Sequence, residues 1–168
     1  MFNLYKFRSV TDISPAFLQK LGVKCLLLDI DNTLMAYSAP LPPPELAAWT
    51  QSIQAAGIEL RILSNAKSET RANTVAAHLG VRYSYNSKKP RTKKARALTA
   101  DYPDKKKLAA VGDQFFTDGL EGVFLGARSV LVRPLVLSGR GLMPVMRRLR
   151  YYAELPFRLL AKNGEELS

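Results

Sequence analysis

The sequence contains one cysteine and one histidine, and this scarcity excludes several kinds of site. Cys25 lies inside an apolar run and has no second cysteine to pair with, so a disulfide framework cannot form. CxxC redox centres and four-ligand zinc sites are excluded for the same reason. His78 falls in the middle of a predicted helix and is interpreted as an ordinary helix residue. We therefore expect an intracellular protein.

Long apolar runs are also missing from the chain. No stretch reaches the roughly 18 uncharged residues that a membrane-spanning helix needs. The first ten residues carry Lys6 and Arg8 among aromatic residues but have no long apolar core, so they do not resemble a secretory signal peptide. We expect a cytoplasmic protein, with peripheral association at the inner face of the membrane as an open alternative.

Acidic residues are scarce relative to basic ones. The chain has 14 Asp and Glu against 25 Lys and Arg, which gives a formal net charge of +11. Such a charge favours an anionic partner, and nucleic acid, an anionic membrane and a strongly phosphorylated substrate all qualify. The basic residues gather in two clusters: residues 82–107, and a second group made up of Arg147, Arg148, Arg150 and Arg158. Composition alone does not choose among the three partners.

A chain of 168 residues, 47% of them apolar, is long enough to bury one core, which favours a single domain. Apolar runs alternate with helical patterns. The predicted strands cover residues 23–29, 58–63, 81–85, 108–111 and 129–132, and the predicted helices cover 15–21, 44–56, 68–79, 92–100 and 117–125. This alternation predicts an α/β fold with a doubly wound, five-strand parallel sheet in residues 1–138. Residues 139–168 are expected to form a basic amphipathic extension of the same domain.

Polar side chains follow four of the five predicted strands. They are Asp29 and Asp31, then Ser64 and Asn65, then Lys88 and Lys89, and finally Asp113 and Asp118. Two aspartates spaced by one residue are often only a turn. However, ligands of parallel sheets bind at the carboxyl ends of strands, where all these groups are expected to meet.

This set of carboxylates, a hydroxyl and an amine is suited to phosphoryl transfer. That reaction needs an in-line nucleophile, a divalent cation and fixed positive groups that take up the charge on the phosphate oxygens. A carboxylate nucleophile gives an aspartyl-phosphate intermediate. Mg²⁺ prefers oxygen ligands, so Asp29, Asp113 and a backbone carbonyl suit it better than they suit zinc.

The order of these motifs resembles that of the haloacid dehalogenase-type phosphatases across nearly the whole domain. The resemblance implies that Asp29 is the nucleophile and a magnesium ligand, and that Asp31 is the general acid/base and also binds the metal through its backbone carbonyl. It further implies phosphate-binding roles for Ser64 and Lys89, with Lys88 as the alternative lysine, a metal-ligand role for Asp113, and a supporting role for Asp118, through water or by orienting Lys89. Asn65 is expected to contribute a backbone amide, and Thr33 a hydroxyl that stabilises the motif.

Within that superfamily the sequence is most similar to the YqeG-type subgroup, which includes phosphatidylglycerophosphate phosphatases of mitochondria and plastids. The resemblance is carried by residues 28–34 (LDIDNTL), 63–66 (LSNA), 89–90 (KP) and 112–118 (GDQFFTD). Residues 35–37 depart from it, since a Val and a Trp are expected there. Each interval between motifs holds only one helix and its strand, so we expect no cap domain.

The C-terminal stretch, residues 142–162, is predicted to form two helical pieces broken at Pro156. Its apolar residues alternate with arginines after the fifth strand is complete, which is typical of a segment that lies at an anionic membrane surface. Packing on the sheet or on a second subunit, as in a homo-oligomer, is the alternative. We therefore hypothesise a peripheral phosphatase of a lipid phosphate such as phosphatidylglycerophosphate.

Other functions remain open at this point. The enzyme could hydrolyse a small soluble phosphosugar or nucleotide instead of a lipid. A basic RNA-binding module without catalysis is disfavoured, because no RNA-recognition signature is present and Tyr83 and Tyr85 fall in a predicted strand. A degenerate scaffold is disfavoured because every catalytic residue type is present.

Overall fold

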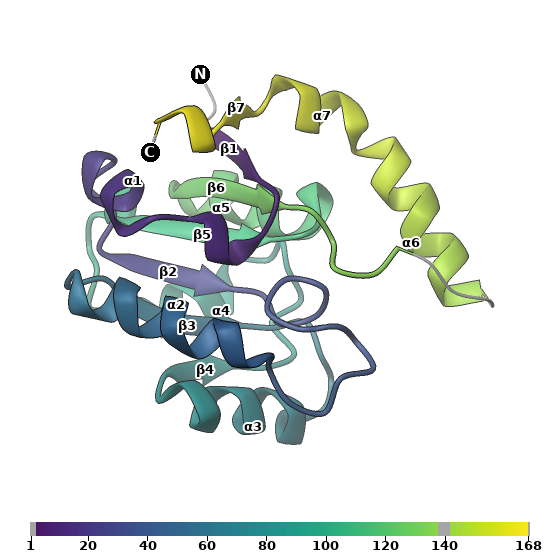
Figure 1. Ribbon diagram of the computed structural model, residues 1–168, viewed down its shortest axis with the longest axis horizontal. Coiled ribbons are helices and arrows are strands. Elements are labelled where there is room, and N and C mark those ends of the chain that lie inside the picture. The colour runs from purple at the N-terminus through teal and green to yellow at the C-terminus, as the bar shows by residue number, and fades with distance from the viewer. Residues whose placement is uncertain (1–2, 138–141, 168) are drawn as a thin grey trace.

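The computed structural model describes residues 3–137 and 142–167 (Figure 1). Its centre is a sheet of parallel strands in the order β4-β3-β2-β5-β6-β1-β7. The strands are β1 (Leu4–Phe7), β2 (Cys25–Leu28), β3 (Glu59–Leu63), β4 (Arg82–Ser84), β5 (Leu108–Gly112), β6 (Arg128–Val132) and β7 (Lys162–Asn163). The predicted α/β class and doubly wound sheet are confirmed. The predicted number of five strands is wrong, because β1 and β7 also join the sheet, where β1 pairs with β6 and β7 pairs with β1.

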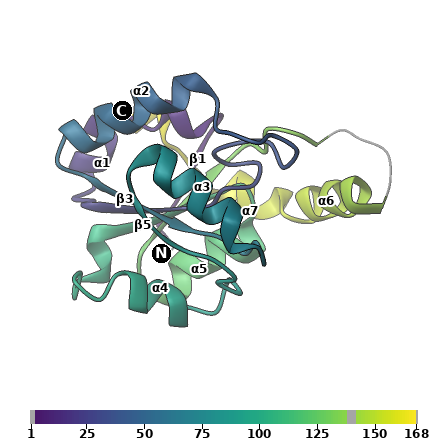
Figure 2. The same cartoon turned by 90° about the horizontal axis from the view of Figure 1, so that it is seen from below.

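Helices cover both faces of the sheet, as Figure 2 shows. One face carries α1 (Pro15–Lys20), α2 (Pro44–Ala55) and α3 (Glu69–Leu79), and the other carries α4 (Lys93–Leu98) and α5 (Leu120–Leu125). The chain ends with α6 (Leu142–Ala153) and α7 (Leu155–Leu160). Short 3-10 turns lie at Val10–Asp12, Lys105–Lys107 and Glu165–Leu167, and a π turn lies at Phe115–Gly119.

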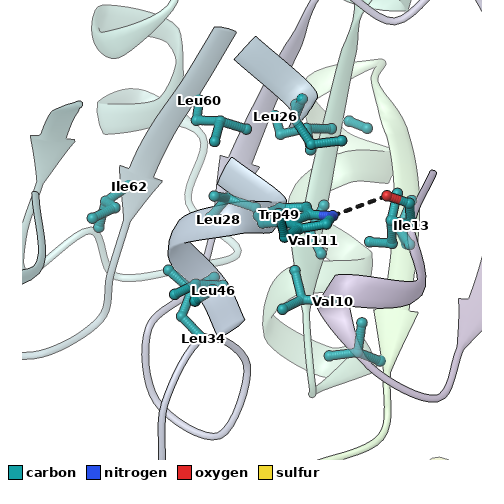
Figure 3. Close-up of a cluster of buried hydrophobic side chains, with 14 of the residues drawn as sticks. Val10, Ile13, Leu26, Leu28, Leu34, Leu46, Trp49, Leu60, Ile62 and Val111 are labelled. Carbon is teal, nitrogen blue, oxygen red and sulfur yellow. Dashed lines mark hydrogen bonds between the residues drawn. The ribbon is translucent and has the colours of Figure 1, made fainter. Parts of the chain in front are cut away.

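The central strand β2 is buried on both faces, which explains its continuous apolar sequence. Leu26 and Leu28 belong to the larger core beneath α1, α2 and α3, while Cys25 and Leu27 belong to the smaller core beneath α4 and α5. In the larger core, Trp49 donates a hydrogen bond of 2.9 Å from Nε1 to the backbone carbonyl of Ile13 (Figure 3). This bond satisfies the only polar atom of the Trp49 side chain in a buried position.

The strand order reverses between β2 and β5. From β2 the chain proceeds outward to β3 and β4, whereas from β5 it proceeds to β6 on the other side. Leu28 and Val111 are in register at the ends of the two strands, so the residues that follow them emerge side by side. A doubly wound sheet binds its ligands at this position.

The C-terminal segment divides into two parts. α6 projects from the body of the protein (Figure 1), but α7 and β7 return to it. The Phe157 ring stacks on Phe115 with centroids 4.1 Å apart, Ala161 is buried, and β7 pairs with β1. The second part of the stretch therefore packs on the sheet, which is the alternative to a membrane-surface segment that the sequence left open.

The helical break in this segment lies at Glu154 instead of Pro156. Pro156 occupies the first turn of α7, where its missing N–H would have no helical partner in any case. The domain boundary predicted between residues 138 and 139 lies outside the described residues.

No separate lid is inserted in the part of the chain that the structure describes. One helix connects β2 to β3, one connects β3 to β4 and one connects β4 to β5, so the site is open as expected. Among the same residues, no helix combines the length and the apolar character needed to cross a membrane.

Candidate active site

Lys89 joins two carboxylates at the point where the strand order reverses. Its Nζ donates to Oδ1 of Asp29, which follows β2, at 2.6 Å, and to Oδ1 of Asp118, in the turn after β5, at 2.5 Å. The backbone of Lys89 is fixed in turn, since its N–H donates to Oδ1 of Asn65 at 2.7 Å. Lys89 is only 8% exposed, whereas the alternative lysine, Lys88, is exposed. Of the two lysines, Lys89 is the one in the site.

Three carboxylates surround this lysine closely enough to share a cation. Asp29, Asp113 and Asp118 each offer an oxygen, and these oxygens lie within 4.8 Å of one another. Oδ1 of Asp113 is buried and has no hydrogen-bond partner among the described residues. An oxygen-only set with an unpartnered buried carboxylate suits a hard divalent cation. Gly112 permits the arrangement, because the Asp118 side chain fills the space that a Cβ there would need.

The electrostatics of the cluster also favour added positive charge. Burial raises the pKa of Asp29 to about 7 against the opposing effect of Lys89. Burial, together with the charges of Asp118 and Asp29, raises the pKa of Asp113 well above its usual value. Burial alone would lower the pKa of Lys89, but its ion pairs with Asp118 and Asp29 raise it. Three carboxylates thus share one ammonium group, and a bound cation would relieve their repulsion.

Asp31 lies apart from this carboxylate cluster. Its Oδ1 accepts a hydrogen bond of 2.9 Å from Nε of Arg71 on α3. Arg71 also donates to the backbone carbonyls of Ala36 and Ala39, at 3.1 and 3.0 Å, so its guanidinium joins Asp31 to the loop that follows β2. Sequence reasoning missed Arg71, because a lone arginine on a helix forty residues away carries no signal of this contact.

The remaining predicted site residues lie near the cluster but differ in access. Asn65 lines the same cavity as Asp29 and Asp31, whereas Ser64 does not. The Ser64 side chain is buried, and its Oγ accepts a hydrogen bond from the N–H of Ala66 at 3.1 Å. Thr33 is buried as well, and within the described residues its hydroxyl has no hydrogen-bond partner.

A cavity of about 850 Å³ opens above the cluster. Its floor includes Asp29 and Lys89, and one wall belongs to α6, a part of the chain to which sequence reasoning gave no role in the site. That wall is formed by Met146, Arg147, Leu149, Arg150 and Ala153. Arginines of the second basic cluster therefore lie in the same cavity as the aspartates.

Comparisons with known proteins identify the family of this chain. A family model described as mitochondrial PGP phosphatase matches residues 4–136. The chain is 31% identical over 132 residues to a Bacillus subtilis protein described as probable phosphatase YqeG, covering 78% of this chain and 76% of that protein. The residues matched by the family model, 4–136, span all the motif residues discussed above. The helices α6 and α7 lie beyond that range.

Two solved structures share the fold at low sequence identity. One is the cobalt-bound deoxy-D-mannose-octulosonate 8-phosphate phosphatase of Haemophilus influenzae, with a TM-score of 0.52 and 18% identity, covering 80% of this chain and 92% of that one. The other is a hypothetical protein of Xanthomonas campestris, with a TM-score of 0.50 and 15% identity, covering 74% and 72%. The chain belongs to the PGP phosphatase family and is a phosphatase of the haloacid dehalogenase type.

Proposed function

We propose that the protein is a magnesium-dependent phosphomonoester hydrolase in which Asp29 is the covalent nucleophile. The observation that supports this most directly is the position of Asp29, at a strand end beside Lys89, Asp113 and Asp118. A phosphate that approaches Asp29 would meet one ammonium group and the oxygens of a cation site, which is the charge pattern that phosphoryl transfer needs.

In the first step, an Asp29 oxygen attacks phosphorus and the bond to the leaving oxygen breaks. Asp31, as the acid, transfers its proton to that oxygen, which leaves as an alcohol. In the second step, water attacks the phosphorus of the aspartyl-phosphate, and Asp31 accepts a proton from this water. The bond between phosphorus and Asp29 breaks, so inorganic phosphate leaves and Asp29 is restored. Lys89 and the Asn65 backbone amide hold phosphate oxygens in both steps. Ser64 joins them when its buried hydroxyl, which accepts from the N–H of Ala66 in this structure, turns toward the cavity.

The residues proposed to hold Mg²⁺ are Asp29, Asp113, Asp118 and the backbone carbonyl of Asp31. Asp118 also holds Lys89 at 2.5 Å, so it can act on the lysine as well as on the metal. When bound, the ion supplies stabilisation of the charge that develops on the phosphate oxygens.

We propose a lipid phosphate such as phosphatidylglycerophosphate as the substrate. The family description supports this choice, and so does the open cavity, which can admit a headgroup at a bilayer surface. Exposed apolar side chains on the C-terminal helices support peripheral membrane binding: Val145, Met146, Leu149 and Tyr152 on α6, and Leu155, Leu159 and Leu160 on α7. Arginines on the same helices suit an anionic surface.

A substrate panel tests this proposal. Phosphate release is measured from phosphatidylglycerophosphate in anionic vesicles, from a soluble phosphosugar, from a nucleotide and from an aryl phosphate, each with Mg²⁺ and with a chelator. We expect hydrolysis only with the metal and the highest kcat/KM for the lipid. Faster cleavage of the soluble esters would exclude the lipid assignment. A protein that cleaves none of them and binds RNA would contradict the enzyme assignment itself.

A further inference from the structure

Arg150 on α6 is connected to the carboxylate cluster through one residue. Its Nη1 donates to Oε1 of Gln114 at 2.5 Å, and the backbone N–H of Gln114 donates to Oδ2 of Asp118 at 3.2 Å. Arg150 and Gln114 both line the cavity above Asp29. The contact therefore holds the guanidinium of Arg150 at the wall of the cavity whose floor includes Asp29.

Arg147 approaches the same cavity from one helical turn earlier. Its guanidinium lies over the ring of Tyr37, 4.7 Å from the ring centroid, and Tyr37 belongs to the loop after β2 that also contains Asp31. Stacking of this kind orients a guanidinium while leaving its N–H groups free to bind an anion in its plane. Arg147 and Arg150 are thus held by two different loops of the site.

Neither arginine is neutralised within the described residues. Asp29 and Asp118 are paired with Lys89, Asp31 is paired with Arg71, and no ion pair of Arg147 or Arg150 occurs in the described parts of the chain. A substrate with a single phosphate needs Lys89 and a cation at the Asp29 end. The guanidinium groups of Arg147 and Arg150 add two positive charges to the cavity, more than a single phosphate group requires.

We propose that Arg147 and Arg150 select substrates that carry a second phosphate, bridged to the first by a short polyol. This inference rests on the proposed function and adds the residues that bind the second phosphate of the substrate. Guanidinium groups bind phosphate oxygens in a bidentate manner, which suits a phosphodiester that remains intact while the phosphomonoester is cleaved. α6 lies outside the matched residues 4–136, so this selectivity belongs to a segment outside the family match.

The test compares two soluble substrates, glycerol phosphate and deacylated phosphatidylglycerophosphate, which adds a phosphodiester to the same phosphomonoester. The proteins are wild type, Arg147→Gln/Arg150→Gln and Arg148→Gln. The last is a control that removes one positive charge from the same helix, at an exposed side chain that does not line the cavity. We expect wild type to prefer the two-phosphate substrate in kcat/KM, and the double variant to lose about tenfold or more of this ratio, since charge-assisted hydrogen bonds are the strong ones. Arg148→Gln should retain the ratio.

Measurements of binding alone test this inference independently of the proposed catalysis. The dissociation constants of both compounds are measured by calorimetry in an Asp29→Asn background, where turnover is not needed. A binding preference that the double variant loses supports the inference even if wild type hydrolyses neither compound. An unchanged ratio in a folded double variant, or an equal loss of the ratio in Arg148→Gln, would each overturn it.

Discussion

Arg71 holds Asp31 by an ion pair of 2.9 Å that joins α3 to the loop after β2. The same guanidinium binds two carbonyls of that loop, so one side chain fixes the positions of both the loop and the Asp31 carboxylate. If Asp31 transfers protons to and from the substrate, its position relative to Asp29 depends on this arginine. Arg71 therefore becomes a positioning residue for the reaction.

Arg71→Lys should lower kcat while the protein remains folded. Lysine keeps the charge but cannot bind a carboxylate and two carbonyls from one planar group. A misplaced catalytic group can cost about 10²-fold in rate, so we expect a loss of at least about tenfold. Steady-state kinetics measures it. Arg82→Lys is the control, because Arg82 forms its two ion pairs with Glu59 and Asp101 and none with Asp31. Wild-type kcat in Arg71→Lys would contradict the positioning role.

Asp29→Asn should retain about a hundredth of the wild-type activity or less, because an amide is neither a nucleophile nor an anionic ligand. Stability should hold or rise. Burial raises the pKa of Asp29 to about 7, so above that pH the folded protein carries an unfavourable buried charge that asparagine lacks, and Lys89 keeps Asp118 as its partner. Activity assays and urea denaturation at pH 8 measure the two effects. Substantial activity in a clean preparation excludes Asp29 as the nucleophile.

Asp31→Asn should lower activity less than Asp29→Asn does, and should prolong the life of the aspartyl-phosphate. The second step loses its general base, so water attacks the intermediate more slowly. Mass spectrometry of acid-quenched reactions measures the phosphorylated fraction in the variant and in wild type. If neither protein is ever found phosphorylated, direct attack by water replaces the covalent mechanism.

Glu121 should make the protein less stable as pH rises. Both of its carboxylate oxygens are buried without a hydrogen-bond partner among the described residues, and burial raises its pKa from 4.5 to about 7. The folded state therefore retains a proton that the unfolded state releases, so stability is full below about pH 4.5 and declines through pH 7. At 1.36 kcal/mol per pKa unit, Glu121→Gln should gain up to about 3 kcal/mol over wild type at pH 8.

Urea denaturation of both proteins between pH 4.5 and 8, in chelator, measures this difference. Asp29 and Asp113 remain in the variant, so its decline with pH should be shallower than that of wild type without disappearing. Parallel stability curves for the two proteins would show that Glu121 does not titrate in this range.

Leu159→Ser/Leu160→Ser should weaken binding to anionic vesicles. These side chains are 77% and 80% exposed on α7, beyond the part of the helix that packs on Phe115. Each buried apolar side chain contributes about 1.5–3 kcal/mol, so the double change should lower the vesicle affinity by about a hundredfold or more, measured by flotation at low salt. Phe124→Ser on α5, 55% exposed, is the control. Equal flotation of all three proteins would argue against a membrane surface on α7.

The strand ends could be predicted from the sequence because their signals are local. An apolar run followed directly by Asp29, or by Asp113, is visible within a few residues, and the resemblance to a family assigned their roles. β7 could not be predicted, since a two-residue strand exists only because β1 lies beside it. The same reason applies to Arg71, whose importance depends on a loop forty residues away.

The packing of the C-terminal segment could not be predicted from its hydrophobic pattern. Apolar residues alternate with arginine along all of it, and this pattern alone does not distinguish a membrane surface from a core contact. Phe157 and Ala161 found partners in Phe115 and the sheet, whereas Leu159 remained exposed. Whether an apolar side chain is surplus depends on the surfaces that the fold leaves uncovered, which are not recorded in the local sequence.

The position of β1 has a consequence for how the chain is made. β1 leaves the ribosome before every other strand described here, yet its partners are β6 and β7, and Tyr5 pairs with Val130 and Lys162. The sheet can form from β2, β3, β4 and β5 while β1 is still unpaired. Until residues 128–132 emerge, its side chains at Tyr5 and Phe7, buried in the finished fold, have no sheet to join. A nascent chain that stalls before β6 therefore presents an unpaired aromatic strand to chaperones and proteases.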